Sequence, residues 1–478
     1  MSKKKQKSME ELLEEALVPE EEQPYPVPEN WVWTRLGNVV DFINGDRGKG
    51  YPSKKDFVQH GIPFINAGHL ENGNINMEKM NYISNEKYDS LRSGKVINND
   101  VLYCLRGTLG KAAIVRGIDK GAIASSLVIL RPNNDVNNSY LYFYLISGLG
   151  KSMIEIHDNG SAQPNLSVNN VKKFIFPLPP KYEQKRIAEK IERLFAKIDE
   201  AKRLIEEVKE SFELRRTAIL DKAFKGQLGT NDPNEKSMLE TSNNINEKDL
   251  IPKEEQPYEV PENWVWTNIN AISSLVVDGS HNPPPKQSEG IPMLSGKNIH
   301  NGYINFETDR FVTEEDYKKE YKRTPIEKND VLLTIVGTIG RSTVVRDFSK
   351  PFVLQRSVAL IKPNILADFL CYYFQTPYFQ HYLQSNAKGT AQKGVYLRTL
   401  KTSFVPLPPY NEQKRIAEKV DNLLSKLDNE KEMVLEVEQK LDLLKQSILN
   451  KAFRGELGTN DPTEESAIEL LKEVLQSK

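Results

Sequence analysis

The sequence contains few of the residues that form disulfides or metal sites. Its 478 residues include two cysteines, Cys104 and Cys371, one in each half, and six histidines that lack the spacing of metal ligands. Two isolated cysteines do not make a disulfide framework, so we expect both thiols to be core residues of a protein in a reducing compartment, the cytoplasm. The scattered histidines predict no metal site.

Long apolar runs and an excess of one charge are absent as well. No window approaches the roughly 20 apolar residues that cross a bilayer, and the start, MSKKKQKSMEELLEEAL, lacks the apolar core of a signal peptide. The 65 Lys and Arg residues are balanced by 66 Asp and Glu residues. We therefore expect a soluble protein without a membrane partner and without an overwhelming positive field, although local basic surfaces fit this balance.

Three short motifs resemble catalytic sequences but lack their essential parts. HNPPPK (His281–Lys286) contains Asn-Pro-Pro, as in amino-methyltransferases, but Pro285 stands where an aromatic residue must stack the base. GTLGK, from Gly107, lacks the glycine spacing of a P-loop and the Ser or Thr that follows it. Glu183-Gln184-Lys185 matches a nuclease-like E-x-K without an acidic partner on a preceding strand, so a solvated helix end is the better interpretation. We predict a chain that is not an enzyme, with no catalytic or metal-binding residue.

What the sequence does contain is a duplication. The octapeptide EQKRIAEK occurs at 183–190 and again at 412–419, each time after PLPP, and each copy opens a run that ends in KAFKGQLGTNDP or KAFRGELGTNDP. EEQPYPVPENWVWT from Glu21 returns as EEQPYEVPENWVWT from Glu254. The period of about 230 residues indicates a duplicated domain and not a solenoid. Because the C-terminal SAIELLKEVLQSK resembles the N-terminal MEELLEEALVPEEEQPY, the repeat is nearly circular, as if the two ends meet.

Each half combines a globular α/β part with one long helix. Short β-branched runs surround a GTxG turn in NDVLYCLRGTLGKAAIV and in NDVLLTIVGTIGRSTVV, which predicts a strand pair in each half. The expected organisation is an N-terminal tail or helix (1–22), a first α/β domain (23–180), a central helix (181–229), a polar linker (230–253), a second α/β domain (254–409), a C-terminal helix (410–458) and a C-terminal tail or helix (459–478).

The two long helices carry the clearest pattern. Their apolar residues are spaced alternately by four and three over about four heptads, which is typical of a coiled coil, and Gly226 and Gly455 suit C-terminal caps. About 40 residues at 1.5 Å each form a rod of about 60 Å. Because both copies lie on one chain, each helix is the economical partner of the other, and an antiparallel pair relates the halves by a pseudo-twofold axis. The alternative is that each helix packs on its own domain. The expected seam consists of Ile187, Ile191, Leu194, Ile198, Ile205, Val208, Ile416, Val420, Leu423, Leu427, Val434 and Val437, continued by Leu441, Leu444 and Ile448.

Two similar domains on a rigid rod suit the recognition of two short DNA sites, since one turn of B-DNA is about 34 Å long. Direct readout requires basic and amide side chains on loops that reach a groove. The framework phrases are shared between the halves whereas the loops differ, as with Ala124-Ser125 against Gln355-Arg356. For any single loop residue an ordinary exposed position is an equally good interpretation. The candidate DNA-binding residues are Arg47, Lys49, Lys54, Lys55, Asn66, His69, Arg106, Lys111, Gln163 and Asn165 in the first half, and His281, Lys286, Lys297, Asn298, Arg341, Gln355, Arg356, Gln392 and Lys393 in the second.

With these motifs the chain resembles the specificity (S) subunit of a type I restriction-modification system. PENWVW, NDVL with GTxG, the GSAQPNLS and GTAQKGV loops, and PLPP before EQKRIAEK cover essentially the whole chain. The resemblance implies an α+β fold of two α/β target recognition domains in tandem, separated by two long helices that form an antiparallel coiled coil with near-circular symmetry. Each domain would read one half of a bipartite, asymmetric DNA site, and the helices would act as a ruler. One departure is that Lys393 and Gly394 stand in the second loop where the first has Pro164 and Asn165.

The resemblance also implies partners. Such subunits bind double-stranded DNA, two methyltransferase (modification) subunits that use S-adenosylmethionine, and two restriction subunits that are ATP-driven translocases. S-adenosylmethionine, ATP and Mg²⁺ are therefore expected on the partner subunits, and no cofactor on this chain. The outer faces of the helices, with Lys185, Arg186, Glu189, Lys190 and Glu192, are the expected docking surface. A coiled-coil scaffold with duplicated protein-binding domains is the alternative, and an enzyme with an unfamiliar site is a third hypothesis.

Overall fold

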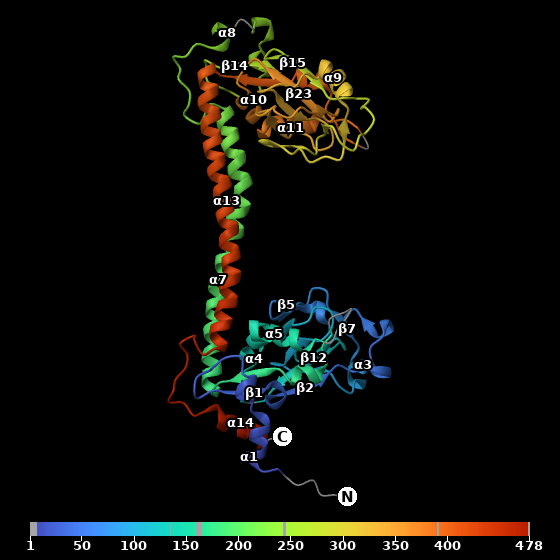
Figure 1. Ribbon diagram of the computed structural model, residues 1–478, viewed down its shortest axis with the longest axis vertical. Coiled ribbons are helices and arrows are strands. Elements are labelled where there is room, and N and C mark those ends of the chain that lie inside the picture. Colours follow the sequence, from blue (N-terminus) through green and yellow to red (C-terminus); the bar gives the residue numbers. More distant parts are fainter. Residues whose placement is uncertain (1–6, 134, 159–164, 242–244, 390–391, 477–478) are drawn as a thin grey trace. The chain divides into compact units, whose positions relative to one another are not determined.

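The chain folds into two compact units (Figure 1). The computed structural model describes residues 7–133, 135–158, 165–241, 245–389 and 392–476. Unit 1 comprises Met1–Leu204 and Glu436–Lys478, and unit 2 comprises Ile205–Leu435. Each unit therefore contains one globular α/β part and a portion of each long helix. The sequence placed a boundary in the segment 230–253, whereas the division between the units runs through the helices.

Two main sheets form the globular part of unit 1. The four-stranded sheet is antiparallel with the order β10-β9-β12-β2, and the five-stranded sheet has the order β3-β7-β4-β11-β8. Along β12, Val128 and Leu130 join one apolar cluster and Leu127 and Ile129 join another, because side chains alternate across a strand. The four-stranded sheet is thus buried on both faces. The strands are β1 (Val32–Arg35), β2 (Val40–Asn44), β3 (Phe57–Val58), β4 (Ile62–Ile65), β5 (Leu70–Glu71), β6 (Asn74–Ile75), β7 (Asn81–Ile83), β8 (Lys95–Val96), β9 (Val101–Cys104), β10 (Ala112–Ile114), β11 (Gly121–Ile123), β12 (Leu127–Pro132) and β13 (Ile175–Leu178), and the short helices are α1 (Met9–Ala16), α2 (Leu36–Val39), α3 (Asn85–Ser90), α4 (Asn138–Ile146), α5 (Gly148–His157), α6 (Val168–Lys172) and α14 (Ala467–Gln476).

Unit 2 repeats this arrangement. Its four-stranded sheet has the order β15-β23-β20-β21, and its three-stranded sheet has the order β19-β16-β22. Strand β23 divides the core as β12 does: Ala359 and Ile361 face one cluster, while Val358 and Leu360 face the other. The strands are β14 (Val265–Asn268), β15 (Ser273–Asp278), β16 (Ile291–Leu294), β17 (Ile299–His300), β18 (Tyr303–Ile304), β19 (Phe311–Val312), β20 (Val331–Thr334), β21 (Ser342–Val344), β22 (Val353–Leu354), β23 (Val358–Pro363) and β24 (Phe404–Leu407), and the short helices are α8 (Met238–Thr241), α9 (Glu314–Arg323), α10 (Ala367–Phe374), α11 (Pro377–Asn386) and α12 (Leu397–Lys401).

The long helices α7 (Lys181–Phe224) and α13 (Tyr410–Phe453) pair in an antiparallel sense. In unit 1, Asp199 of α7 forms an ion pair with Lys445, and Lys202, one turn further along, pairs with Asp442. The partner number falls as the α7 number rises, so the helices run in opposite directions. The sequence prediction of an antiparallel pair is confirmed.

Both long helices end in the same glycine cap. Gly226 and Gly455 have φ values of 70° and 72°, a left-handed conformation that glycine adopts without strain. After α7, the Gln227 N–H donates to the Lys222 carbonyl, which is the longer hydrogen bond of a Schellman motif. A Cβ at Gly226 would also lie 2.4 Å from Pro261. The prediction of glycine caps is confirmed.

The prediction of the helix seam is partly wrong in the middle of the two helices. Val208 and Val437 are 40% and 46% exposed, and Leu444 is 47% exposed. The buried or half-buried positions of α13 from residue 423 to residue 449 are Leu423, Leu424, Leu427, Glu430, Val434, Glu438, Leu441, Lys445, Gln446, Ile448 and Leu449. At two places the half-buried position is one residue after the expected one: Glu438 follows Val437, and Lys445 follows Leu444.

The two ends of the chain meet in unit 1. Helices α1 and α14 contact one another, and Ala467, Leu471 and Val474 of α14 are buried in the main apolar cluster of the unit. The backbone N–H of Ala467 donates to the Asn30 carbonyl (2.9 Å). The expectation that the ends come together is confirmed, and the C-terminal segment is part of a core and not a free tail.

The segment 230–253 is likewise packed against unit 2. Met238 and Ile245 are buried in the same apolar cluster as Trp264, and Asn263 donates a hydrogen bond to the Asp232 carbonyl (2.9 Å). The interpretation of this segment as a polar linker is therefore wrong for its described residues, because the few apolar side chains within it are the ones that pack.

Candidate nucleic-acid interface

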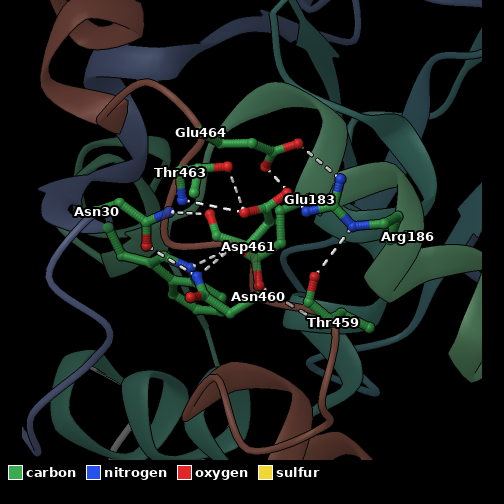
Figure 2. A network of polar contacts seen from close by, with 9 residues as sticks. Asn30, Glu183, Arg186, Thr459, Asn460, Asp461, Thr463 and Glu464 are labelled. Atoms are coloured by element: carbon green, nitrogen blue, oxygen red, sulfur yellow. Dashed lines mark hydrogen bonds and ion pairs between the residues drawn. The ribbon is translucent and has the colours of Figure 1, made fainter.

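The octapeptide EQKRIAEK begins near the start of each long helix, and Figure 2 shows the polar contacts of its first copy. Glu183 is fully buried, and its Oε2 accepts hydrogen bonds from Trp31 Nε1 (2.8 Å) and Asn460 Nδ2 (2.8 Å). Burial raises the pKa of the Glu183 carboxyl despite these donors. The interpretation of Glu183 as part of a solvated helix end is wrong, because its partners come from segments far away in the sequence.

Arg186, in the same octapeptide, binds the segment after α13 (Figure 2). Its two terminal nitrogens donate to both carboxylate oxygens of Glu464 (2.7 and 2.9 Å), and its Nε donates to the Thr459 carbonyl (3.0 Å). Lys190 donates to the Leu457 carbonyl (2.6 Å). Arg186 and Lys190 were expected on an outer docking face, but their cationic groups are engaged within unit 1.

Unit 2 builds the same network with the second copy. Glu412 accepts a hydrogen bond from Trp264 Nε1 (3.2 Å), and burial raises its pKa as well. Arg415 donates to both carboxylate oxygens of Glu235 (3.0 and 2.7 Å), and Lys419 donates to the Leu228 carbonyl (2.7 Å). The repeated letters therefore have one structural task, which is to hold the chain around each helix start.

The loops that differ between the halves surround a hollow in each unit. In unit 1 a hollow of about 350 Å³ lies between the turn after β9 and the start of α6. The Leu166 N–H donates to the Leu105 carbonyl (2.9 Å), and Arg106 Nε donates to Asn165 Oδ1 (3.3 Å), which ties the loop to the turn. The polar lining consists of Asn44, Arg47, Arg106, Asn165, Ser167, Asn169 and Lys172.

Unit 2 has a hollow of about 550 Å³ at the equivalent place. The Val395 N–H donates to the Ile335 carbonyl (2.8 Å), as Leu166 does to Leu105 in unit 1. The cationic, amide and aromatic side chains along it differ from those of unit 1: they are His281, Arg356, Lys388, Gln392, Tyr396 and Arg398. The two hollows therefore have the same backbone arrangement but different lining side chains.

A buried carboxylate positions two side chains beside this second hollow. Asp278, at the end of β15, is 8% exposed. Its Oδ2 lies 2.6 Å from His281 Nε2, and its Oδ1 lies 3.1 Å from an Arg323 nitrogen. A neighbouring hollow of about 440 Å³ is lined by Lys286, Lys297 and Gln355.

The structure brings together part of the predicted DNA-contact set. Arg47, Arg106 and Asn165 line the hollow of unit 1; His281, Arg356 and Gln392 line the larger hollow of unit 2; and Lys286, Lys297, Asn298 and Gln355 line its smaller one. Lys54, Lys55, Lys111 and Lys393 are exposed but are not among the lining residues, and Arg341 is half-buried. Gln163 and the Lys49 side chain lie outside the described residues. Contact with DNA stays a prediction for each of them.

Three predicted residues are engaged within their own loops. The Asn66 side-chain oxygen accepts a hydrogen bond from the Gly68 N–H (2.8 Å). His69 is 6% exposed, and its Nδ1 accepts a hydrogen bond from the Asn66 backbone N–H (3.1 Å). At the equivalent position Asn298 accepts from the Ser295 N–H (2.9 Å) and donates to the carbonyls of Asn305 and Glu307. These side chains shape the turn after β4 or β16, so their polar groups are used by the fold.

Sequence reasoning missed several cations and an aromatic residue at the hollows. Lys172 and Lys401 occupy equivalent places on α6 and α12, and Lys172 lines the hollow of unit 1. Arg398 and Tyr396 line the hollow of unit 2. Alignment of SVNNVK (167–172) with YLRTLK (396–401) would have found them, because the two stretches share their last lysine and differ before it.

Each half of the chain buries its single cysteine. Cys104 and Cys371 are buried, which raises the pKa of both thiols, so the prediction of core cysteines is confirmed. Among the residues that the structure describes, no helix is long and apolar enough to cross a membrane, and no group of His, Cys, Asp and Glu side chains is placed to hold a metal ion.

The chain has two related α/β parts and a pair of long helices, and the hollows of the two parts have cationic linings of different composition. This combination is typical of proteins that recognise nucleic acid through two related domains. Comparison with known families identifies it further. The chain belongs to the family described as the type I restriction modification DNA specificity domain, whose model matches residues 28–210 and 280–439. It is a DNA-recognition subunit and not a catalytic one, as the sequence predicted.

Curated relatives match along most of the chain. The type I restriction enzyme EcoBI specificity subunit of Escherichia coli is 28% identical over 443 residues, which cover 90% of this chain and 87% of the relative. The MjaVIII specificity subunit of Methanocaldococcus jannaschii is 26% identical over 430 residues, which cover 87% and 92% of the two chains.

Solved structures share the fold. The HsdS subunit from Thermoanaerobacter tengcongensis is 21% identical with a TM-score of 0.61, and the match covers 91% of this chain and all of that one. A chain from a study of complex assembly in the type I R-M system has a TM-score of 0.64 with the same identity and coverage. The antiparallel, near-circular architecture expected from the sequence is confirmed.

Proposed function

We propose that each unit reads one half of a bipartite, asymmetric DNA site and that the paired helices set the distance between the halves. The observation that carries this proposal is the pair of equivalent hollows with different linings. Arg47 and Arg106 of unit 1 stand where unit 2 has His281 and Val336. Arg and His side chains can donate to base edges or phosphates, so one scaffold with two linings suits two different half-sites.

The proposal includes partners. The chain assembles with two methyltransferase subunits, which hold S-adenosylmethionine, and with two restriction subunits, which hold ATP and Mg²⁺; the complex acts in the cytoplasm. One solved structure with this fold comes from a study of complex assembly in the type I R-M system, which supports such partners.

The docking surface that we propose for the methyltransferase is apolar and repeated. In unit 2, Val208 and Leu214 are 40% and 72% exposed, and in unit 1 the same repeat positions, Val437 and Leu443, are 46% and 70% exposed. The same apolar residue type is exposed at both members of each equivalent pair, and this repetition supports a common docking surface. Changing both Leu214 and Leu443 to aspartate should abolish assembly in analytical ultracentrifugation while leaving the unfolding midpoint of the free chain unchanged. Normal assembly of this variant would contradict the surface.

Exchange of one domain tests modular readout. Replacing residues 35–176 with those of another family member should change one half-site only, measured as sequence-selective binding by fluorescence anisotropy of the chain assembled with its methyltransferase. The binding should weaken steeply with salt, because phosphate contacts release counterions. Absence of sequence-selective binding, or a change in both half-sites, would refute the proposal. A protein-binding scaffold, the alternative, would show neither selectivity nor a steep salt dependence.

A further inference from the structure

The residue before helix α12 lacks the N-cap hydrogen bond that its counterpart in unit 1 forms. Ser167 is the N-cap of α6, and its hydroxyl accepts a hydrogen bond from the Asn170 N–H (3.1 Å). The repeat places Tyr396 at this position in unit 2, and α12 has no side-chain hydrogen bond at its N-cap. Serine is among the preferred N-cap residues and tyrosine is not, so unit 2 lacks a contact that stabilises the helix of unit 1.

The ring of Tyr396 does not compensate by packing inside the fold. The residue is 64% exposed, although several tyrosines of this chain, such as Tyr373, are fully buried. A buried aromatic side chain removes a large area from water, and Tyr396 forgoes that gain. Tyr396 therefore contributes neither an N-cap hydrogen bond nor a buried ring to the stability of unit 2. Residues that do not favour the fold locally are concentrated at functional sites.

The surroundings of Tyr396 indicate the ligand. It lines the same hollow as Arg356, Lys388 and Arg398, whose side chains are exposed, and as His281, which Asp278 holds at 2.6 Å. The cations suit phosphates and the acceptor atoms of bases. An exposed aromatic ring among them suits an apolar feature of the same ligand, and in the major groove of B-DNA that feature is the C5-methyl group of thymine.

We propose that the ring of Tyr396 packs against a thymine methyl group in the half-site that unit 2 reads, while Arg398 contacts a neighbouring phosphate. This inference rests on the proposed function and names one specificity-determining residue within it. In unit 1 the small Ser167 leaves the equivalent place without an aromatic ring, so the contact distinguishes the two half-sites.

Two variants separate recognition from folding. Tyr396→Ser installs the residue that caps the equivalent helix of unit 1, so it should fold at least as well as the natural chain. Tyr396→Phe keeps the ring and removes only the hydroxyl. Both are compared with the natural chain, each assembled with the methyltransferase, after the target site has been located by mapping methylated adenines.

The probe is a set of duplexes in which each thymine of the site is replaced in turn by deoxyuridine, which lacks the methyl group. For the natural chain and for Tyr396→Phe, one such replacement in one half-site should weaken binding by about three- to fivefold, the effect of one buried methyl group. For Tyr396→Ser the same replacement should have no effect, and replacements in the other half-site should affect all three proteins alike.

Three results would overturn the inference: a unit 2 half-site without thymine, no position that responds to the loss of a methyl group, or an equal response in Tyr396→Ser. In each case sequence-selective binding by the natural chain would leave the proposed function standing. A natural chain that shows no sequence selectivity would instead contradict both.

Discussion

Leu471 offers a direct test of how the C-terminal segment contributes to unit 1. Its side chain lies on α14 and is 0% exposed, in a cluster that also contains Ala16 near the other end of the chain. Leu471→Ala removes the transfer free energy of a buried leucine, about 1.5–3 kcal/mol, and adds the cost of the cavity, for a total of about 2–5 kcal/mol. That loss is a large fraction of the free energy of unfolding of a typical domain, which is about 5–15 kcal/mol.

Amide hydrogen exchange measures this loss separately in each unit. Exchange of the central strand β9 of unit 1 should accelerate by about 30-fold or more, because its protection depends on unfolding of the unit. Exchange of β20 in unit 2 should not change. Lys472→Ala is the matched control, since Lys472 lies on the same helix in an exposed ion pair with Glu469 and should cost less than about 1 kcal/mol. Unchanged exchange of β9, or equal acceleration in β20, would refute the view that α14 completes the core of unit 1.

Three further predictions concern the helix start, the hollow and the rod. Because burial raises the pKa of Glu183, the folded state binds this proton more tightly than the unfolded state, and unit 1 should lose stability as the pH rises from the usual carboxyl pKa through the raised one. The excess stability of the natural chain over Glu183→Gln, from urea midpoints, should therefore shrink with rising pH, and an excess that grows would contradict this assignment. Arg398→Ala should reduce the slope of log affinity against log salt by about 1, and an unchanged slope in anisotropy titrations would exclude a phosphate contact. Removing one heptad from each long helix shortens it by about 10 Å, so methylation mapping should show a shorter spacer or no activity, and an unchanged spacer would contradict a ruler.

The sequence was most informative where both copies of the repeat agree. The antiparallel helices, the caps at Gly226 and Gly455 and the meeting of the chain ends all follow from phrases that occur twice or that match between the two ends. Two copies of the same local signal reduce the chance that either is accidental. A glycine at the end of a long apolar pattern also has a specific physical reason, the left-handed cap.

Prediction of the helix seam failed where a charged side chain is half-buried and the neighbouring apolar one is exposed. Val208 and Val437 fit an a/d pattern, but they are exposed, whereas Glu438 and Lys445 are half-buried. Charged side chains with long aliphatic stems can occupy such positions while their charged ends reach water. A pattern of apolar residues alone does not reveal that, because it assigns every position of the seam to an apolar side chain.

Two polar residues that were expected to be exposed, Glu183 and Asn298, are buried for the same reason. Glu183 and Asn298 are polar in the sequence and buried in the structure, since their partners are backbone groups and side chains that the fold brings near them. Single-sequence reasoning treats a polar residue as exposed by default. The exception is visible only through its hydrogen-bond partners, and those of Glu183 lie more than a hundred positions away.

The separation between repeated and unrepeated residues has a mechanical explanation. Glu183 and Glu412 anchor the helix starts through hydrogen bonds to Trp31 and Trp264, all of which lie in repeated phrases and away from the linings of the hollows. Loop residues such as Tyr396 make few demands on this framework, so they can change without disturbing it. A lining can then acquire a new base preference at the cost of one helix cap, whereas a change at Glu183 would leave a buried indole N–H unpaired, at about 1–3 kcal/mol. Lining residues that take part in no buried hydrogen bond can therefore change at little cost to the fold.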